Sequence, residues 1–248
     1  MPKKRPKLRT VEKHQPPYPL NNFPETFPID LGREIIFLLA TKQTASLEGE
    51  DWEAIFAKCI NAQWKPSNVG LDDVLLKQTA WSAKSVKHKK PANCETVRLI
   101  SGRNSPAYSF GVDEILKQNP RNLGEMVLDI WNERVAAVKK NYQLLRTVVL
   151  IKSDDLLELA VFEFNTEMYD PNSYDWSWNK NKNLIGTSKN TGNHSFTWQP
   201  HGSQFTIIEE VPNSKLAIRL KQPLALDRDS VLRAIGFDDS WVQVLTRQ

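Results

Sequence analysis

The stretch from Gly49 to Lys84 constrains the fold of this chain more than any other, because a helical pattern is followed at once by two strand patterns. Its first part places apolar side chains at helical spacing, namely Trp52, Ile55, Phe56, Cys59 and Ile60. Such spacing predicts a helix with one buried face. A turn-rich segment follows at 65–70, and residues 73–77 and 79–86 have the composition of strands. We therefore expect a helix, a turn and two neighbouring strands.

The remainder of the chain mixes helical and strand patterns. Helices are expected from about Asp30 and over 122–142, where Met126, Ile130, Ala137 and Val138 would form the core face. Strands are expected at 95–100, 147–152, 156–164, 205–209 and 216–221. This order predicts an α/β fold in which a central mixed β-sheet is flanked by helices. Residues 165–204 are rich in Asn, Trp, Ser and Lys and are expected to form a polar and aromatic insertion.

The first 27 residues differ from the rest because they are rich in proline and carry a cluster of positive charge. The basic side chains of this cluster are Lys3, Lys4, Arg5, Lys7 and Arg9. Residues 1–27 are therefore expected to be an arm that lies over the body or is disordered. Residues 28–248 can bury the core of a single domain, with the stretch at about 165–204 as its insertion.

Composition excludes several classes of protein. No apolar run approaches the roughly 20 residues of a membrane span, and the basic N-terminus is not a secretory signal. Cys59 and Cys94 are too few for a disulfide framework or a four-cysteine zinc site. A reduced, cytoplasmic protein without membrane contact is expected. The net charge of +4 permits binding to a polyanion without requiring it. Phosphate-loop, dinucleotide-binding and serine-hydrolase motifs do not occur in the sequence.

Three charged residues of the stretch 49–84 have the types needed to hydrolyse a phosphodiester. That reaction needs a hydrated divalent cation, an activated water and neutralisation of negative charge in the transition state. Glu53 on the helix and Asp73 at the start of the first strand could bind Mg²⁺, which prefers oxygen ligands. Lys84 on the second strand could assist the attacking water. Taken singly, Asp73 and Lys84 would also suit a turn and an exposed strand position.

The order of these residues resembles the PD-(D/E)xK nuclease superfamily, which includes type II restriction endonucleases. The resemblance covers this one stretch. In that family a Gly-x-x-aromatic-Glu pattern marks a first helix, a glycine-led strand brings in the aspartate, and the next strand ends in the lysine. The matching positions here are Gly49, Trp52 and Glu53, then Gly70, Asp73 and Val74, then Lys84.

The sequence departs from the family pattern at two positions. Asp72 stands where the family has proline, and Ser82 stands where it has the second acidic residue. Some restriction enzymes of the family have serine there and take their glutamate from a helix. The resemblance thus implies a catalytic set of Asp73, Lys84, Glu53 and Ser82, with Mg²⁺ bound by Asp73 and Glu53. Glu95 is the alternative second carboxylate.

The resemblance implies a restriction–modification enzyme, a homodimer that cuts double-stranded DNA at a specific short sequence. A structure-selective repair or recombination nuclease and a non-catalytic DNA-binding module remain alternatives. Side chains that suit contacts to DNA bases and phosphates lie after the third expected strand, after Lys84 and in the polar stretch. The DNA-contact candidates are Arg103, Asn104, Ser105, Lys87, Lys180, Lys182, Gln199, His201, Ser203 and Gln204.

Overall fold

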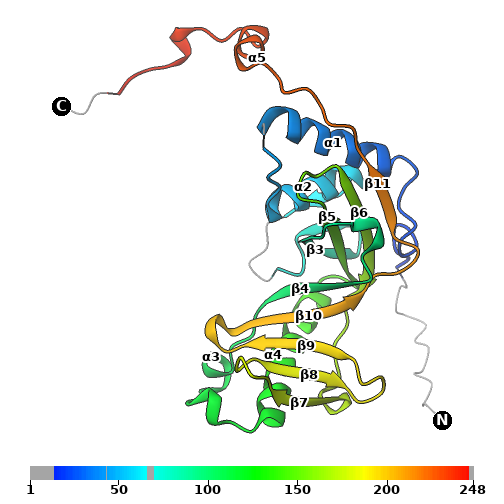
Figure 1. Cartoon of the computed structure of the whole chain (residues 1–248), viewed down its shortest axis with the longest axis vertical. Helices are drawn as coiled ribbons and strands as arrows, with labels where there is room; N and C mark the ends of the chain where they lie inside the picture. Colours follow the sequence, from blue (N-terminus) through cyan, green and yellow to red (C-terminus); the bar gives the residue numbers. More distant parts are fainter. Residues whose placement is uncertain (1–13, 43, 66–69, 246–248) are drawn as a thin grey trace.

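The computed structural model describes residues 14–42, 44–65 and 70–245, and two β-sheets form its framework (Figure 1). The first sheet has six strands in the order β1-β2-β3-β5-β6-β11. These strands are β1 (Gln63–Trp64), β2 (Val74–Leu76), β3 (Thr79–Lys87), β5 (Leu144–Lys152), β6 (Glu158–Asn165) and β11 (Leu216–Arg219). Strands β3 and β5 are parallel and their other neighbours are antiparallel. The expected mixed central sheet flanked by helices is confirmed.

Helices α1 (Phe27–Lys42) and α2 (Gly49–Cys59) cover one face of this sheet. Helix α2 begins with a capping box, in which Glu48 and Asp51 exchange side-chain to backbone hydrogen bonds. Its buried stripe packs on the sheet, where the rings of Phe56 and Trp81 meet edge to face with centroids 6.0 Å apart. The expected stripe of α2 is therefore confirmed, and it fixes which face of α2 points towards β3.

The second sheet has five antiparallel strands in the order β4-β10-β9-β8-β7. Its strands are β4 (Thr96–Arg103), β7 (Tyr174–Trp178), β8 (Leu184–Ser188), β9 (His194–Gln199) and β10 (Gln204–Glu210). The polar and aromatic stretch 165–204 thus supplies β7, β8 and β9. Its tryptophans are structural, because Trp176 and Trp198 belong to a buried cluster with Phe196 and Phe205.

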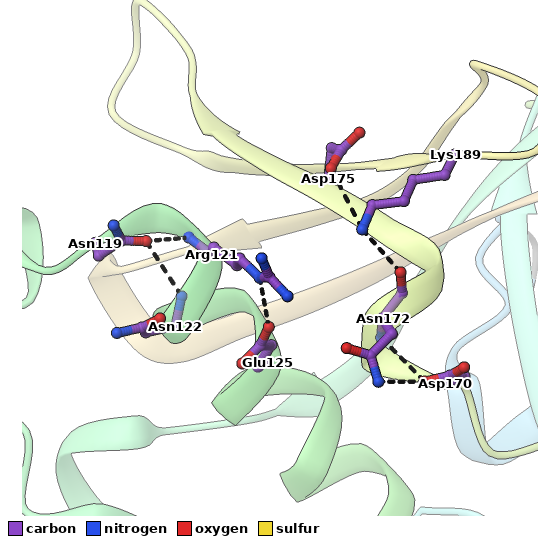
Figure 2. Close-up of polar contacts among 8 residues, drawn as sticks. All are labelled: Asn119, Arg121, Asn122, Glu125, Asp170, Asn172, Asp175 and Lys189. Atoms are coloured by element: carbon purple, nitrogen blue, oxygen red, sulfur yellow. Dashed lines mark hydrogen bonds and ion pairs between the residues drawn. The ribbon is translucent and has the colours of Figure 1, made fainter.

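Helix α4 (Pro120–Lys139) packs between the two sheets. Asn119 caps its N-terminus, accepting hydrogen bonds from the backbone N–H groups of Arg121 and Asn122 at 2.9 and 3.4 Å (Figure 2). Of the expected core face, Val138 is buried, but Ala137 is exposed and Met126 and Ile130 are only half-buried. The buried face is instead Leu123, Gly124, Val127, Leu128, Trp131, Val135 and Val138.

The segment before α1 lies against the first sheet. Tyr18 is buried, and its hydroxyl donates to the Glu163 carboxylate at 2.8 Å. The same carboxylate accepts from the Trp81 indole at 2.6 Å and pairs with the Arg146 guanidinium at 3.1 Å. These contacts hold the segment around Tyr18 against the first sheet. Residues 1–13, with the basic cluster of the arm, lie outside the described residues.

The remaining helices are short. They are α3 (Pro106–Phe110), α5 (Arg228–Ala234) and single 3₁₀ turns at Pro91–Asn93, Ile115–Lys117, Pro171–Ser173, His201–Ser203 and Asp239–Trp241. Within the described ranges, every helix falls short of the length and apolarity needed to cross a membrane.

Candidate functional site

Asp73, Lys84 and Glu53 lie on three adjoining elements. Asp73 immediately precedes β2, and its neighbour Val74 is the register partner of Trp81 on β3. Helix α2 contacts both of these strands, which places Glu53 beside them. The Asp73 carboxylate is 3% exposed and accepts a hydrogen bond from the Ala83 backbone N–H at 3.2 Å. The carboxylate is therefore fixed against the residue that precedes Lys84.

Alternation along β3 separates its side chains as the sequence predicted. Trp81 and Ala83 face the core beneath α1 and α2. Ser82 and Lys84 share the other face, where both donate to the Gly70 carbonyl, at 2.8 Å from Oγ and 3.5 Å from Nζ. Ser82 is fully buried, so it positions the backbone of Gly70 rather than facing solvent.

The charge of Asp73 is incompletely compensated. Burial raises its pKa to about 6, Lys84 opposes this rise, and the negative charges of Glu53 and Asp72 add to it. A carboxylate in this position is costly to ionise, and a bound cation would relieve that cost.

Lys84 shows the complementary behaviour. Burial lowers the pKa of Lys84, while Asp73 and Glu53 act in the opposite direction. Since Asp73 and Glu53 both act on the Lys84 ammonium, the three expected residues lie within range of one another's charges. A lysine with a lowered pKa beside two carboxylates is a common arrangement in active sites.

Asp73, Lys84 and Glu53 are here called the Asp73 group, and Glu53 lies at its edge. Its side chain is half-buried, and its Oε2 accepts from the Trp64 indole N–H at 3.2 Å. The alternative carboxylate, Glu95, lies elsewhere. It precedes β4 and lines a cavity of 880 Å³ with Glu210 and Lys215. Given the rise per strand residue, Glu95 lies about 20 Å along the strand from Ser101. Of the two candidates, Glu53 is the carboxylate whose charge acts on Asp73 and Lys84.

Arg134 of α4 was not anticipated from the sequence. Its guanidinium donates to the Ser101 carbonyl at 2.6 Å and to Asn104 Oδ1 at 3.1 Å. It also stacks 5.6 Å from the centroid of the Trp131 ring. Burial lowers the pKa of Arg134, and the charge of Asp73 opposes that change. Arg134 therefore connects the end of β4 with the Asp73 group.

The backbone around Arg134 leaves room for its guanidinium. Gly102 has φ +109°, and a Cβ at this position would lie 2.7 Å from both terminal nitrogens of Arg134. Only glycine fits this close approach. In the sequence, the only sign of this arrangement is the glycine of Ser101-Gly102 before the polar Arg103-Asn104. Its partner Arg134 is a helix residue more than thirty positions away, so the sequence alone does not connect the two.

The donor set of the group suits Mg²⁺. Asp73 and Glu53 offer carboxylate oxygens, which Mg²⁺ prefers, and the buried negative charge of Asp73 favours a cation. In the described part of the chain, no group of three or more His, Cys, Asp and Glu side chains is placed to hold a metal.

Most of the DNA-contact candidates lie at one end of the second sheet. Arg103 at the end of β4 is the register partner of Gln204, and Gln204 is also that of Gln199 at the end of β9. His201 and Ser203 lie in the turn between β9 and β10. Lys180 and Lys182 lie in the β7–β8 turn, which adjoins this end because Leu184 pairs with Trp198. All but the half-buried Gln199, Ser203 and Gln204 are exposed.

The three remaining DNA-contact candidates lie outside the turns at this end of the second sheet. Asn104 is fully buried, donating to the Val127 carbonyl at 2.9 Å and accepting from Arg134, so the expectation that it contacts DNA was wrong. Ser105 caps α3 by accepting from the Tyr108 N–H. Lys87 lies at the end of β3, away from the second sheet's turns, and pairs with Asp154 at 3.2 Å.

Lys189 illustrates the opposite end of the second sheet. It follows β8, donates to the Asn172 carbonyl at 2.9 Å and lies 3.6 Å from Asp175 (Figure 2). The lysines of the two ends therefore differ in their surroundings.

No family model, no curated protein and no solved structure matches this chain at a significant level.

Proposed function

We propose that this chain is a Mg²⁺-dependent endonuclease that cuts double-stranded DNA at a specific short sequence, as type II restriction enzymes do. The observation that supports the proposal is that Asp73 is held against β3 one residue before Lys84, and that the charges of Lys84 and Glu53 both act on it. A buried carboxylate with a raised pKa, near a half-buried lysine and a second carboxylate, fits metal-assisted hydrolysis better than it fits a structural role.

In this proposal Asp73 and Glu53 hold Mg²⁺, which when bound would polarise the scissile phosphate and lower the pKa of a bound water. The Ala83 N–H keeps the Asp73 carboxylate oriented towards the site. Lys84 Nζ orients the attacking water and stabilises negative charge on the phosphate oxygens. Attack forms a bond between the water oxygen and phosphorus, and the bond to the leaving sugar oxygen breaks.

Sequence would be read by the end of the second sheet that carries Arg103, Gln199, His201, Ser203 and Gln204. Arginine and glutamine side chains read guanine and adenine in the major groove, whereas Lys180 and Lys182 would contact phosphates. Arg134 links this end to the Asp73 group through Ser101 and Asn104. By analogy with restriction enzymes, two copies would act on a symmetric site. The buried, unbridged Cys59 and Cys94 support a cytoplasmic location.

The test is cleavage of phage and plasmid DNA by the purified chain in Mg²⁺ and in EDTA. Discrete fragments that require Mg²⁺ support the proposal. Cutting confined to branched DNA would instead favour a repair nuclease, and metal-independent binding without cutting would favour a binding module. Glu53→Gln should abolish cleavage, whereas Glu50→Gln, an exposed glutamate of the same helix, should cleave as the unaltered chain does.

A further inference from the structure

The C-terminal segment from Leu224 to Leu245, here called the C-terminal arm, extends away from both sheets (Figure 1). Within this described span every residue except Leu232 is exposed. Helix α5 contains no buried residue, and a short aromatic contact joins Phe237 to Trp241 with ring centroids 5.8 Å apart. The arm therefore has local structure but buries little of its own surface.

The arm is nevertheless apolar. Its exposed large hydrophobic side chains are Leu224, Leu226, Val231, Ile235, Phe237, Trp241, Val242, Val244 and Leu245. Trp241 is 59% exposed and Leu245 is 83% exposed. Single exposed apolar residues are ordinary on a protein surface, but this many within one segment that packs on neither sheet indicate an interaction segment.

A matching exposed apolar stripe lies on helix α1. Ile29, Ile36 and Phe37 are spaced by seven and eight residues, which places them on one helix face. Phe37 is 64% exposed and Ile29 is 62% exposed. The opposite face of α1, with Phe27, Leu31 and Ile35, is fully buried against the first sheet. Helix α1 thus carries exposed apolar side chains on its outer side as well, with the exposed Arg33 between Ile29 and Phe37.

The root of the arm is fixed beside this stripe. The Leu226 N–H donates to the Ala40 carbonyl at the end of α1 at 3.1 Å. Thr41, Leu226 and Val231 help to line an open apolar depression of 370 Å³ at this junction. The arm then extends away from α1 (Figure 1). Ile29 and Phe37 remain exposed.

We propose that two copies of this chain exchange their C-terminal arms, with each arm covering the outer face of α1 and the adjoining depression on the other copy. Because arm and acceptor belong to the same chain and adjoin at the root, a twofold axis near α1 makes the contact reciprocal. The arm has about as many residues as the roughly 20 to 30 that each side of a standard interface contributes. Charge is compatible with this contact, since the arm carries four aspartates and two arginines and the outer side of α1 carries the exposed Arg33.

The first experiment measures the mass of the full chain in solution by light scattering and sedimentation over a range of concentrations. We expect twice the 28.4 kDa of one chain. Phe37→Glu on the acceptor, and Ile235→Glu with Trp241→Glu on the arm, should each weaken dimerisation at least about a hundredfold, as loss of buried apolar anchors does. Leu116→Glu, an equally exposed apolar position near the second sheet, is the matched control and should leave the dimer unchanged.

The second experiment distinguishes exchange from other dimers. A mixture of Phe37→Glu with the Ile235→Glu/Trp241→Glu variant retains one intact arm and one intact acceptor between the two copies. It should form a heterodimer more tightly than either variant pairs with itself. A full chain that stays monomeric to high concentration, or arm variants that dimerise like the unaltered chain, would overturn the proposal. Both results are measured without DNA. Arm variants that dimerise like the unaltered chain would overturn arm exchange alone and leave the two-copy action of the proposed function intact.

Discussion

Asp73 accepts a hydrogen bond at 3.2 Å from the backbone N–H of Ala83, the residue before Lys84. This contact joins the start of β2 to the middle of β3 and fixes a buried carboxylate one residue from the half-buried Lys84. Their opposite pKa shifts have the same main cause, which is burial. Burial without full compensation is destabilising, and it persists in proteins mainly where function requires it.

Asp73→Asn should therefore separate stability from activity. Raising the pKa of Asp73 from 3.8 to about 6 costs the fold up to about 3 kcal/mol at pH 7. The neutral amide removes this cost, which is already net of the attraction to Lys84, so the free energy of unfolding should rise by up to that amount. DNA cleavage should disappear. Urea unfolding at pH 7 and a plasmid assay check both parts, and a variant that is less stable would contradict our account of Asp73.

The pH dependence follows from the same pKa. Between pH 3.8 and about 6 the folded chain binds a proton at Asp73 that the unfolded chain has released. The stability difference between Asp73→Asn and the unaltered chain should therefore be near zero below pH 4 and reach its full value above pH 6. Cleavage should fall about tenfold per pH unit below pH 6 at low Mg²⁺, because the protonated carboxyl cannot bind the cation. Rates that stay flat from pH 7 to 5 would exclude this role.

Glu163→Gln provides a contrasting case. The Glu163 carboxylate is also buried, but it accepts from Tyr18 and Trp81 and pairs with Arg146. Removing its charge leaves the Arg146 guanidinium, itself 4% exposed, without its ionic partner. We expect a loss of about 3–5 kcal/mol in the free energy of unfolding, the usual effect of breaking a buried ion pair. Chemical denaturation measures this, and DNA cleavage per folded molecule should remain unchanged.

The elements around Asp73 could be predicted because their signals are local. The apolar stripe of α2 and the alternation that separates Trp81 and Ala83 from Ser82 and Lys84 depend only on residue spacing within each element. The glycine and aspartate before β2 are likewise close in sequence to β3, and an antiparallel hairpin brings them together.

Features that depend on distant pairing could not be predicted. Residues 165–204 are polar enough to be interpreted as an insertion, yet their strands complete a sheet whose edge, β4, lies about seventy residues earlier. Asn104 lies in a polar segment of the kind that contacts DNA bases. Its side-chain amide instead forms hydrogen bonds inside the protein, with the Val127 carbonyl and the Arg134 guanidinium. The register of α4 was also ambiguous, because apolar residues occur on more than one face and the sheets select which face is buried.

Arg134→Lys should report on the link between β4 and the Asp73 group. A lysine keeps the charge but cannot replace both hydrogen bonds of the planar guanidinium to Ser101 and Asn104. We expect a loss of about 1–3 kcal/mol in stability, since a buried acceptor loses its donor. We also expect slower cleavage with unchanged DNA affinity. Gly102→Ala, whose Cβ would meet the guanidinium, should reproduce the defect, whereas Arg121→Lys at the exposed start of α4 should not.

The end of the second sheet should divide into residues that read bases and residues that contact phosphates. Lys180→Ala and Lys182→Ala should weaken binding about equally for all DNA sequences, and each should reduce the slope of log affinity against log salt by about one. Arg103→Ala should instead cost about 1–3 kcal/mol on the cognate site and relax selectivity at one base pair. Lys189 lies at the opposite end of the sheet and pairs with Asp175, so Lys189→Ala should change neither the salt slope nor the base selectivity. Binding isotherms for cognate and random duplexes at several salt concentrations measure the affinity, the salt slope and the selectivity of each variant. Equal salt slopes for Lys180→Ala and Lys189→Ala would show that this end of the sheet does not face the DNA backbone.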